Sequence, residues 1–109
     1  MVELKRRLLN SEKGNVAILG FSIGGTIAWK ASLRGLKTTE LIAVSSTRLR
    51  FETEIPDCKV KLYFGDQDLN APNEQWFLML KISNEIFENE DHKLYIKQNN
   101  IFLICDDFL

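Results

Sequence analysis

The sequence between residues 16 and 28 constrains the fold more than any other part of the chain. It reads Val-Ala-Ile-Leu-Gly-Phe-Ser-Ile-Gly-Gly-Thr-Ile-Ala, so an apolar run of strand length meets a glycine and a serine follows two positions later. The pattern Gly20-x-Ser22-x-Gly24, with apolar residues at helical spacing after it, predicts a buried strand that turns sharply into a helix. A turn this tight needs small neighbours, which explains Gly20 and Gly24, with Gly25 as the third glycine of the turn.

A strand-turn-helix of this kind is a nucleophile elbow, because it exposes a reactive side chain at the end of a buried strand. We therefore expect Ser22 Oγ to be accessible and Ser22 to be the candidate nucleophile. The N–H of Ile23 belongs to the start of the following helix and is the candidate donor to a developing oxyanion.

Apolar runs alternate with helical patterns along the rest of the chain, and Gly35 is expected to end the helix that begins at Ile23. We expect another helix over 2–10 and a long one that opens at 72–74, with Asn73 as its N-cap, and ends in the polar stretch 89–92. Trp29 and Trp76 fall on the apolar stripes of their helices and are expected in the core. Strands are expected over 16–21, 41–44, 60–64 and 94–96, a turn over 98–100, and a fifth strand or a helix over 101–105.

This alternation predicts an α/β fold: a three-layer parallel sheet of about four or five strands with flanking helices. Ligand sites in such sheets lie at the carboxyl ends of the strands. Ser22, the stretch 45–48, the pair Asp66 and Asp68, and the stretch 98–100 all follow expected strands. We therefore expect a site at this edge of the sheet.

Two segments carry a resemblance to a known family. The residues 20–25, Gly-Phe-Ser-Ile-Gly-Gly, followed by Ala28-Trp29, resemble the nucleophile elbow of the α/β-hydrolase superfamily and most of all that of the dienelactone hydrolases. The segment 60–68, with its Gly65-x-x-Asp68 ending, resembles the penultimate strand of that family and its acid loop. The resemblance covers only the C-terminal half of the family fold, so residues 1–109 are expected to form a single domain without the N-terminal half.

The resemblance implies a hydrolase of carboxylic esters or lactones, with a small-molecule substrate and no cofactor. Ser22 takes the position of the nucleophile, which is typically cysteine in dienelactone hydrolases, and Asp68 takes that of the acid, with Asp66 as the alternative. In the family the histidine lies in the loop after the last strand, which here corresponds to 98–102 and contains none. The one histidine of the chain is His92. It is the candidate base, yet a strand at 94–96 would place it at the opposite edge of the sheet from Ser22.

Two other functions compete with this interpretation. Without a base in reach and without the N-terminal half, the chain would be a catalytically inactive remnant that serves as a binding or structural module. Residues 16–25 also differ from the dinucleotide fingerprint G-x-G-x-x-G only by Ser22 at the middle glycine, and the stretch 45–48 would then hold the 2′-phosphate of NADP. The bulk of serine where the backbone must approach a pyrophosphate counts against that function.

Charge and composition exclude several classes of partner. The net charge of −1 gives no general attraction to nucleic acid or to an anionic membrane, and no apolar run reaches the length of a membrane span. Cys58 and Cys105 are isolated, which predicts buried thiols in a reducing cytoplasm and no metal site. The apolar strand 16–21, with half a sheet missing beside it, predicts a truncated or split hydrolase, or one that forms a homodimer through this edge.

Overall fold

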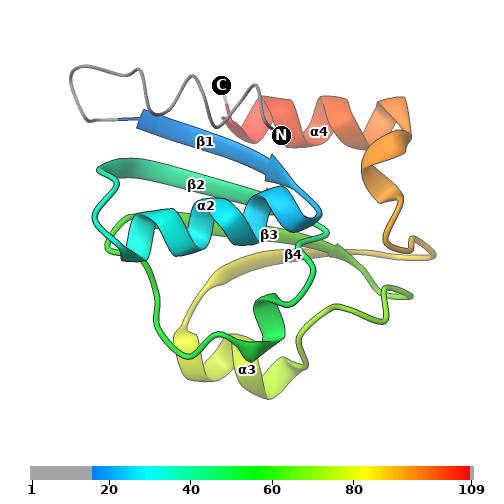
Figure 1. The fold of residues 1–109 in the computed structure, drawn as a ribbon. Coiled ribbons are helices and arrows are strands. Elements are labelled where there is room, and N and C mark those ends of the chain that lie inside the picture. Colours follow the sequence, from blue (N-terminus) through cyan, green and yellow to red (C-terminus); the bar gives the residue numbers. More distant parts are fainter. Residues whose placement is uncertain (1–15, 109) are drawn as a thin grey trace.

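A parallel four-stranded sheet forms the centre of the molecule in the computed structural model, which describes residues 16–108 (Figure 1). Its strands are β1 (Val16–Phe21), β2 (Thr38–Val44), β3 (Lys59–Gly65) and β4 (Ser83–Phe87), and they lie in the order β1-β2-β3-β4. This confirms the predicted parallel sheet. The helix expected over 2–10 lies outside the described residues.

Helices cover both faces of the sheet, so the fold has the three layers that the sequence predicts. The helices α2 (Ile23–Leu33) and α3 (Glu74–Leu80) lie on one face, and α4 (Gln98–Phe108) lies on the other, after the short 3₁₀ helix η2 (Leu94–Ile96). A further 3₁₀ helix, η1 (Leu49–Phe51), follows β2.

Alternating side chains of the central strands supply both cores. Leu41 and Ala43 of β2 pack toward α2 and α3, whereas Ile42 and Val44 pack toward η2 and α4, and all of them are buried. A parallel strand covered on both faces needs such a continuous apolar run. Trp29 and Trp76 are buried as expected, with ring centroids 6.0 Å apart between α2 and α3.

The long helix expected after residue 72 is wrong, because the segment forms α3 and then β4. Asn73 does cap α3, since its Oδ1 accepts the N–H of Trp76 at 2.9 Å. The helix ends at Lys81, whose φ of 54° is left-handed and turns the chain back toward the sheet. Residues 83–87 then pair with β3 instead of extending the helix.

The expected strand at 94–96 is also wrong, since these residues form η2. Residues 98–100, expected as a turn, are the first residues of α4. Of the two alternatives for 101–105, the helix is confirmed and the fifth strand is wrong. The reason is that β4 already completes the sheet, so the apolar residues that follow cover its face. Leu94 and Ile104 are both fully buried there.

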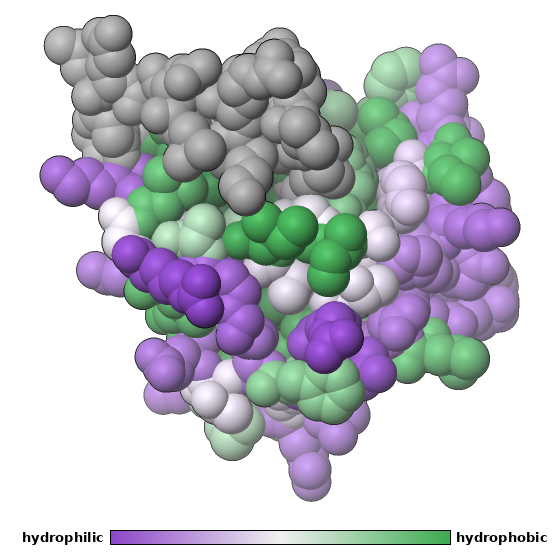
Figure 2. Space-filling view, viewed as in Figure 1, coloured by the Kyte–Doolittle hydropathy of each residue, from purple (hydrophilic) through white to green (hydrophobic). Residues whose placement is uncertain are grey.

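The surface is mixed in character. Apolar side chains are visible over α2 in Figure 2, and Ile23 and Ile27 of this helix are each more than two fifths exposed.

Cys58 and Cys105 are free thiols and are half-buried rather than buried. In the part of the chain that the structure describes, no helix is both long and apolar enough to cross a membrane.

The end of β1 touches the first turn of α2 at Gly20, and this contact gives a test of the fold. A Cβ on Gly20 would lie 2.8 Å from both Cα and N of Gly25, and backbone atoms there cannot move aside. Gly20→Ala should therefore cost about 1–3 kcal/mol of unfolding free energy in urea denaturation. Ala17→Ser, at an exposed position of the same strand, is the control and should stay within about 0.5 kcal/mol. Equal stability of Gly20→Ala and the native chain would contradict the close contact.

Candidate active site

Ser22 lies in the sharp turn between β1 and α2, with φ 53° and ψ −131°. This backbone conformation is rare for a residue other than glycine and is strained. Two backbone hydrogen bonds hold it: the N–H of Ser22 donates to the carbonyl of Val44 at 2.8 Å, and its own carbonyl accepts the N–H of Gly25 at 3.2 Å. The turn thus has the backbone geometry expected of a nucleophile elbow.

Glycines make this turn sterically feasible. Besides the contact of Gly20 described above, a Cβ on Gly25 would overlap the hydroxyl of Ser46 and come within 2.9 Å of the Cβ of Ala43. The first turn of α2 therefore packs directly on the end of β2. Ile23 begins this helix, so its N–H has no carbonyl partner within the helix and is free to face the site.

His92 lies beside Ser22, and the expectation that it sits at the opposite edge of the sheet is wrong. Its Nε2 is 3.0 Å from Ser22 Oγ, within hydrogen-bond distance. The error followed from the misassigned strand at 94–96. Because β4 is the last strand, His92 comes in the loop after its carboxyl end, at the same edge of the sheet as Ser22.

Asp68 completes the arrangement from the loop after β3. Its Oδ2 is 3.4 Å from His92 Nδ1, at the long end of hydrogen-bond distances, and its Oδ1 accepts the N–H of Asn70 at 2.8 Å. The side chain of Asp68 is fully buried, while that of His92 is 31% exposed. The structure therefore brings together Ser22, His92 and Asp68, the three side chains singled out in the sequence.

Asp66, the alternative acid, has a different partner. Its Oδ1 accepts the N–H of Asn89 at 3.0 Å, while its own N–H donates to the carbonyl of Phe87 at 3.0 Å. Asn89 has a φ of 58°, a left-handed conformation that asparagine tolerates better than most residues. Asp66 thus holds the turn that leads to His92, and the geometry pairs the imidazole with Asp68.

The loop that carries His92 is fixed on two sides. Gly65 has no side chain, and a Cβ there would overlap the carbonyl of Glu90, so only glycine lets the two loops pack together. On the other side, Lys97 and Asn100 donate hydrogen bonds to the carboxylate of Glu90. The hydrogen bond from Lys97, and then that from Asn100, lower the pKa of Glu90.

The contacts of His92 with Asp68 and Ser22 favour one tautomer of the imidazole. A buried carboxylate beside Nδ1 favours the tautomer with its proton on that nitrogen. The lone pair of Nε2 then faces the hydroxyl of Ser22, which donates to it. An arrangement of this kind can take a proton from serine as the oxygen attacks an acyl carbon.

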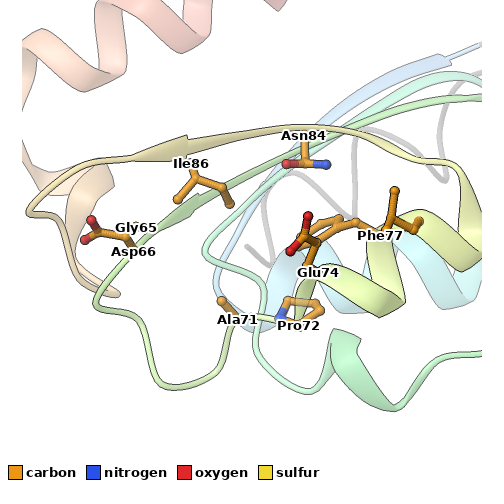
Figure 3. Close-up of a pocket in the computed structure, with 9 residues that line it drawn as sticks. Gly65, Asp66, Ala71, Pro72, Glu74, Phe77, Asn84 and Ile86 are labelled. Carbon is orange, nitrogen blue, oxygen red and sulfur yellow. The ribbon is translucent and has the colours of Figure 1, made fainter.

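A separate hollow of about 520 Å³ lies between α3 and the last two strands (Figure 3). Glu74 and Phe77 of α3 and Asn84 and Ile86 of β4 line it, together with residues of the acid loop. None of Ser22, Asp68 and His92 is among its lining residues. Over residues 16–108, no group of three or more His, Cys, Asp or Glu side chains is placed to hold a metal ion.

The stretch 45–48 does not suit the phosphate site of the dinucleotide hypothesis. Ser45 and Ser46 are fully buried beneath the elbow. The backbone carbonyl of Thr47 accepts a hydrogen bond from the hydroxyl of Thr26, which ties this loop to α2. Thr47 is half-buried and Arg48 is exposed, so the two serine hydroxyls of the stretch are not available to a 2′-phosphate.

No family model matches the sequence, and no curated protein sequence is significantly similar to it. Solved structures do match. A predicted CIB-like hydrolase from Thermoplasma acidophilum superposes with a TM-score of 0.71 at 22% identity, over 97% of this chain and 55% of that one. An α/β serine hydrolase homologue from Coxiella burnetii superposes with a TM-score of 0.58 at 22% identity, over 81% and 47%.

A protein of unknown function from Agrobacterium tumefaciens, proposed to be an α/β hydrolase, matches with a TM-score of 0.72 at 17% identity. The match covers 53% of the length of that protein. This chain therefore spans about half the length of each of the three structures described. Identities this low establish the fold and not the activity. Together with the four parallel strands and the flanking helices, these similarities show that the chain has a truncated α/β-hydrolase fold.

Proposed function

We propose that the protein hydrolyses carboxylic esters or lactones through a serine nucleophile, as the dienelactone hydrolase-like motifs imply. The observation that carries this proposal is the 3.0 Å contact between Ser22 Oγ and His92 Nε2. Asp68 lies on the far side of the same imidazole, which gives the order nucleophile, base and acid that acyl transfer requires. The strained backbone of Ser22 supports the same conclusion, because such strain is concentrated at functional sites.

The reaction proceeds in two halves. Ser22 Oγ attacks the carbonyl carbon while His92 Nε2 takes the hydroxyl proton, and the resulting oxyanion accepts a hydrogen bond from the N–H of Ile23. The tetrahedral species collapses with cleavage of the acyl C–O bond, and His92 gives its proton to the alkoxide, which departs as an alcohol from an ester and stays on the acyl chain of a lactone. Water then attacks the acyl-serine while His92 takes its proton, and cleavage of the bond to Ser22 Oγ releases the acid as His92 returns that proton to Ser22.

Asp68 stabilises the imidazolium that forms in each half. Its side chain is fully buried, so solvent does not screen the attraction as it would at the surface. The N–H of Asn70 holds the second oxygen of the carboxylate, which keeps the first directed at His92. The buried acid thereby orients a partly exposed base.

A binding module without catalysis is the second candidate function. It is favoured by the hollow between α3 and β4, which a ligand could fill without touching Ser22. The number of oxyanion donors also favours it. A hydrolase of this fold normally uses two N–H donors, and within the described residues we assign one, that of Ile23. Covalent labelling of Ser22 distinguishes the two functions.

An activated serine should react with a fluorophosphonate probe. We expect mass spectrometry of the labelled protein to place the adduct on Ser22, because His92 lowers the barrier to attack by removing the hydroxyl proton. Ser22→Ala is the control and should carry no adduct at this position. If the native chain is not labelled and does not turn over p-nitrophenyl acetate, the enzymatic function is wrong and the binding module remains.

The two aspartates should differ in their effects on turnover. Asp68→Asn keeps the shape of the side chain but removes the charge that holds the imidazole tautomer, so kcat should fall by about 10³–10⁴-fold. Asp66→Asn is the matched control two residues away, and its amide oxygen can still accept the N–H of Asn89, so kcat should fall by less than about tenfold. A larger loss in Asp66→Asn than in Asp68→Asn would reassign the acid.

A further inference from the structure

Tyr95 is a side chain outside the triad that contacts both the histidine and the strand of the serine. Its ring centroid lies 6.1 Å from that of His92, with the two planes at 86°. The same ring lies 5.3 Å from that of Phe21, the residue directly before Ser22, at 41°. We propose that Tyr95 is a positioning residue that holds the imidazole of His92 in line with Ser22; this inference rests on the function proposed above.

The imidazole needs such a contact because its two hydrogen bonds constrain it along one axis only. Ser22 lies at Nε2 and Asp68 at Nδ1, so the ring can still swing about the line that joins these two partners. The 3.4 Å contact with Asp68 is long, and nearly a third of the side chain is exposed to solvent. A ring packed perpendicular to the imidazole opposes this swing, at a separation typical of edge-to-face pairs.

Tyr95 can do this because its own backbone is anchored in the core. It lies in η2, between the buried Leu94 and the start of α4. The carbonyl of Leu94 accepts a hydrogen bond from Asn100 Nδ2 at 2.8 Å, and the N–H of Leu94 donates to the carbonyl of Asp91 at 3.2 Å. The phenol ring packs against the apolar cluster under α4, so its position follows that of the sheet.

The ring joins two parts of the site that are far apart in the sequence. Phe21 ends β1, the first strand of the described sheet, while His92 and Tyr95 follow β4, its fourth strand. Contact with both opposes any change in the distance from nucleophile to base. Both contacts involve the ring face or edge, so the aromatic ring rather than the hydroxyl carries the function.

A single histidine in the chain makes a direct test practical, because its imidazole signals in the NMR spectrum need no separation from others. In the native protein, the ring current of Tyr95 should shift the proton signals of the His92 ring. Tyr95→Phe should keep this shift, whereas Tyr95→Leu, which fills similar space without a ring, should lose it. Ile96→Ala, at the exposed neighbouring position of η2, is the control and should leave the shift unchanged.

The same variants should separate in turnover of p-nitrophenyl acetate. Tyr95→Leu should lower kcat by about three- to tenfold with little change in KM, because it disturbs the alignment of the base and not the binding of the substrate. Tyr95→Phe should stay within about twofold of the native rate. If the hydroxyl had a purely structural role, Tyr95→Phe would not keep the native kcat.

Native-like imidazole signals and a native rate in a folded Tyr95→Leu protein would overturn the inference. If Tyr95→Leu does not fold, the test is made on the native protein. Absence of a nuclear Overhauser effect between the Tyr95 and His92 rings there also overturns the inference. The imidazole signals do not depend on turnover. A ring contact seen in a chain that is never labelled at Ser22 would therefore refute the proposed function while leaving the contact itself established.

Discussion

Close packing between the end of β1 and the first turn of α2 is the constraint on which the site depends. The backbone of Gly25 lies where a Cβ of Gly20 would be, and the hydroxyl of Ser46 lies where a Cβ of Gly25 would be. With the strand and the helix this close, the chain between them has to turn within one residue. Ser22 makes that turn in a strained backbone conformation. This conformation points its side chain outward at the carboxyl ends of the strands. The neighbouring strand secures the turn through the hydrogen bond from Ser22 to Val44.

A second close approach of two backbone segments places His92. Gly65 ends β3 against the carbonyl of Glu90, and the N–H of Gln67 donates to that same carbonyl at 2.9 Å. The loops after β3 and β4 therefore form one unit, in which Asp66 supports the backbone and Asp68 faces the imidazole. This explains why two acidic residues stand so close together in the sequence. One fixes where the histidine loop runs, and the other fixes which nitrogen of the imidazole carries the proton.

The local motifs were predictable from the sequence, whereas the path of the chain between residues 81 and 98 was not. The elbow at Ser22, the acid loop at Asp68 and the cap at Asn73 each depend on residues within a few positions, and all three are found. The end of α3 depends on Lys81, a residue with no special preference for the left-handed conformation it adopts. Strand β4 is short and largely exposed, so its sequence lacks the apolar run that identifies β1 to β3. The strand wrongly expected at 94–96 led to the prediction that His92 lies at the opposite edge of the sheet. The order Ser22, Asp68, His92 along the chain is nevertheless that of the α/β hydrolases.

Because β4 is largely exposed, His92 has to be held by other parts of the fold. An edge strand with little burial cannot fix the loop that follows it through its own packing. The structure compensates with contacts from the buried side: Leu94 in the core under α4, Asn100 against both Leu94 and Glu90, and the ring of Tyr95 against His92. His92 therefore takes its position from α4 and η2 more than from the strand before it. In this chain the helix that follows the histidine is as much a part of the site as the helix that follows the serine.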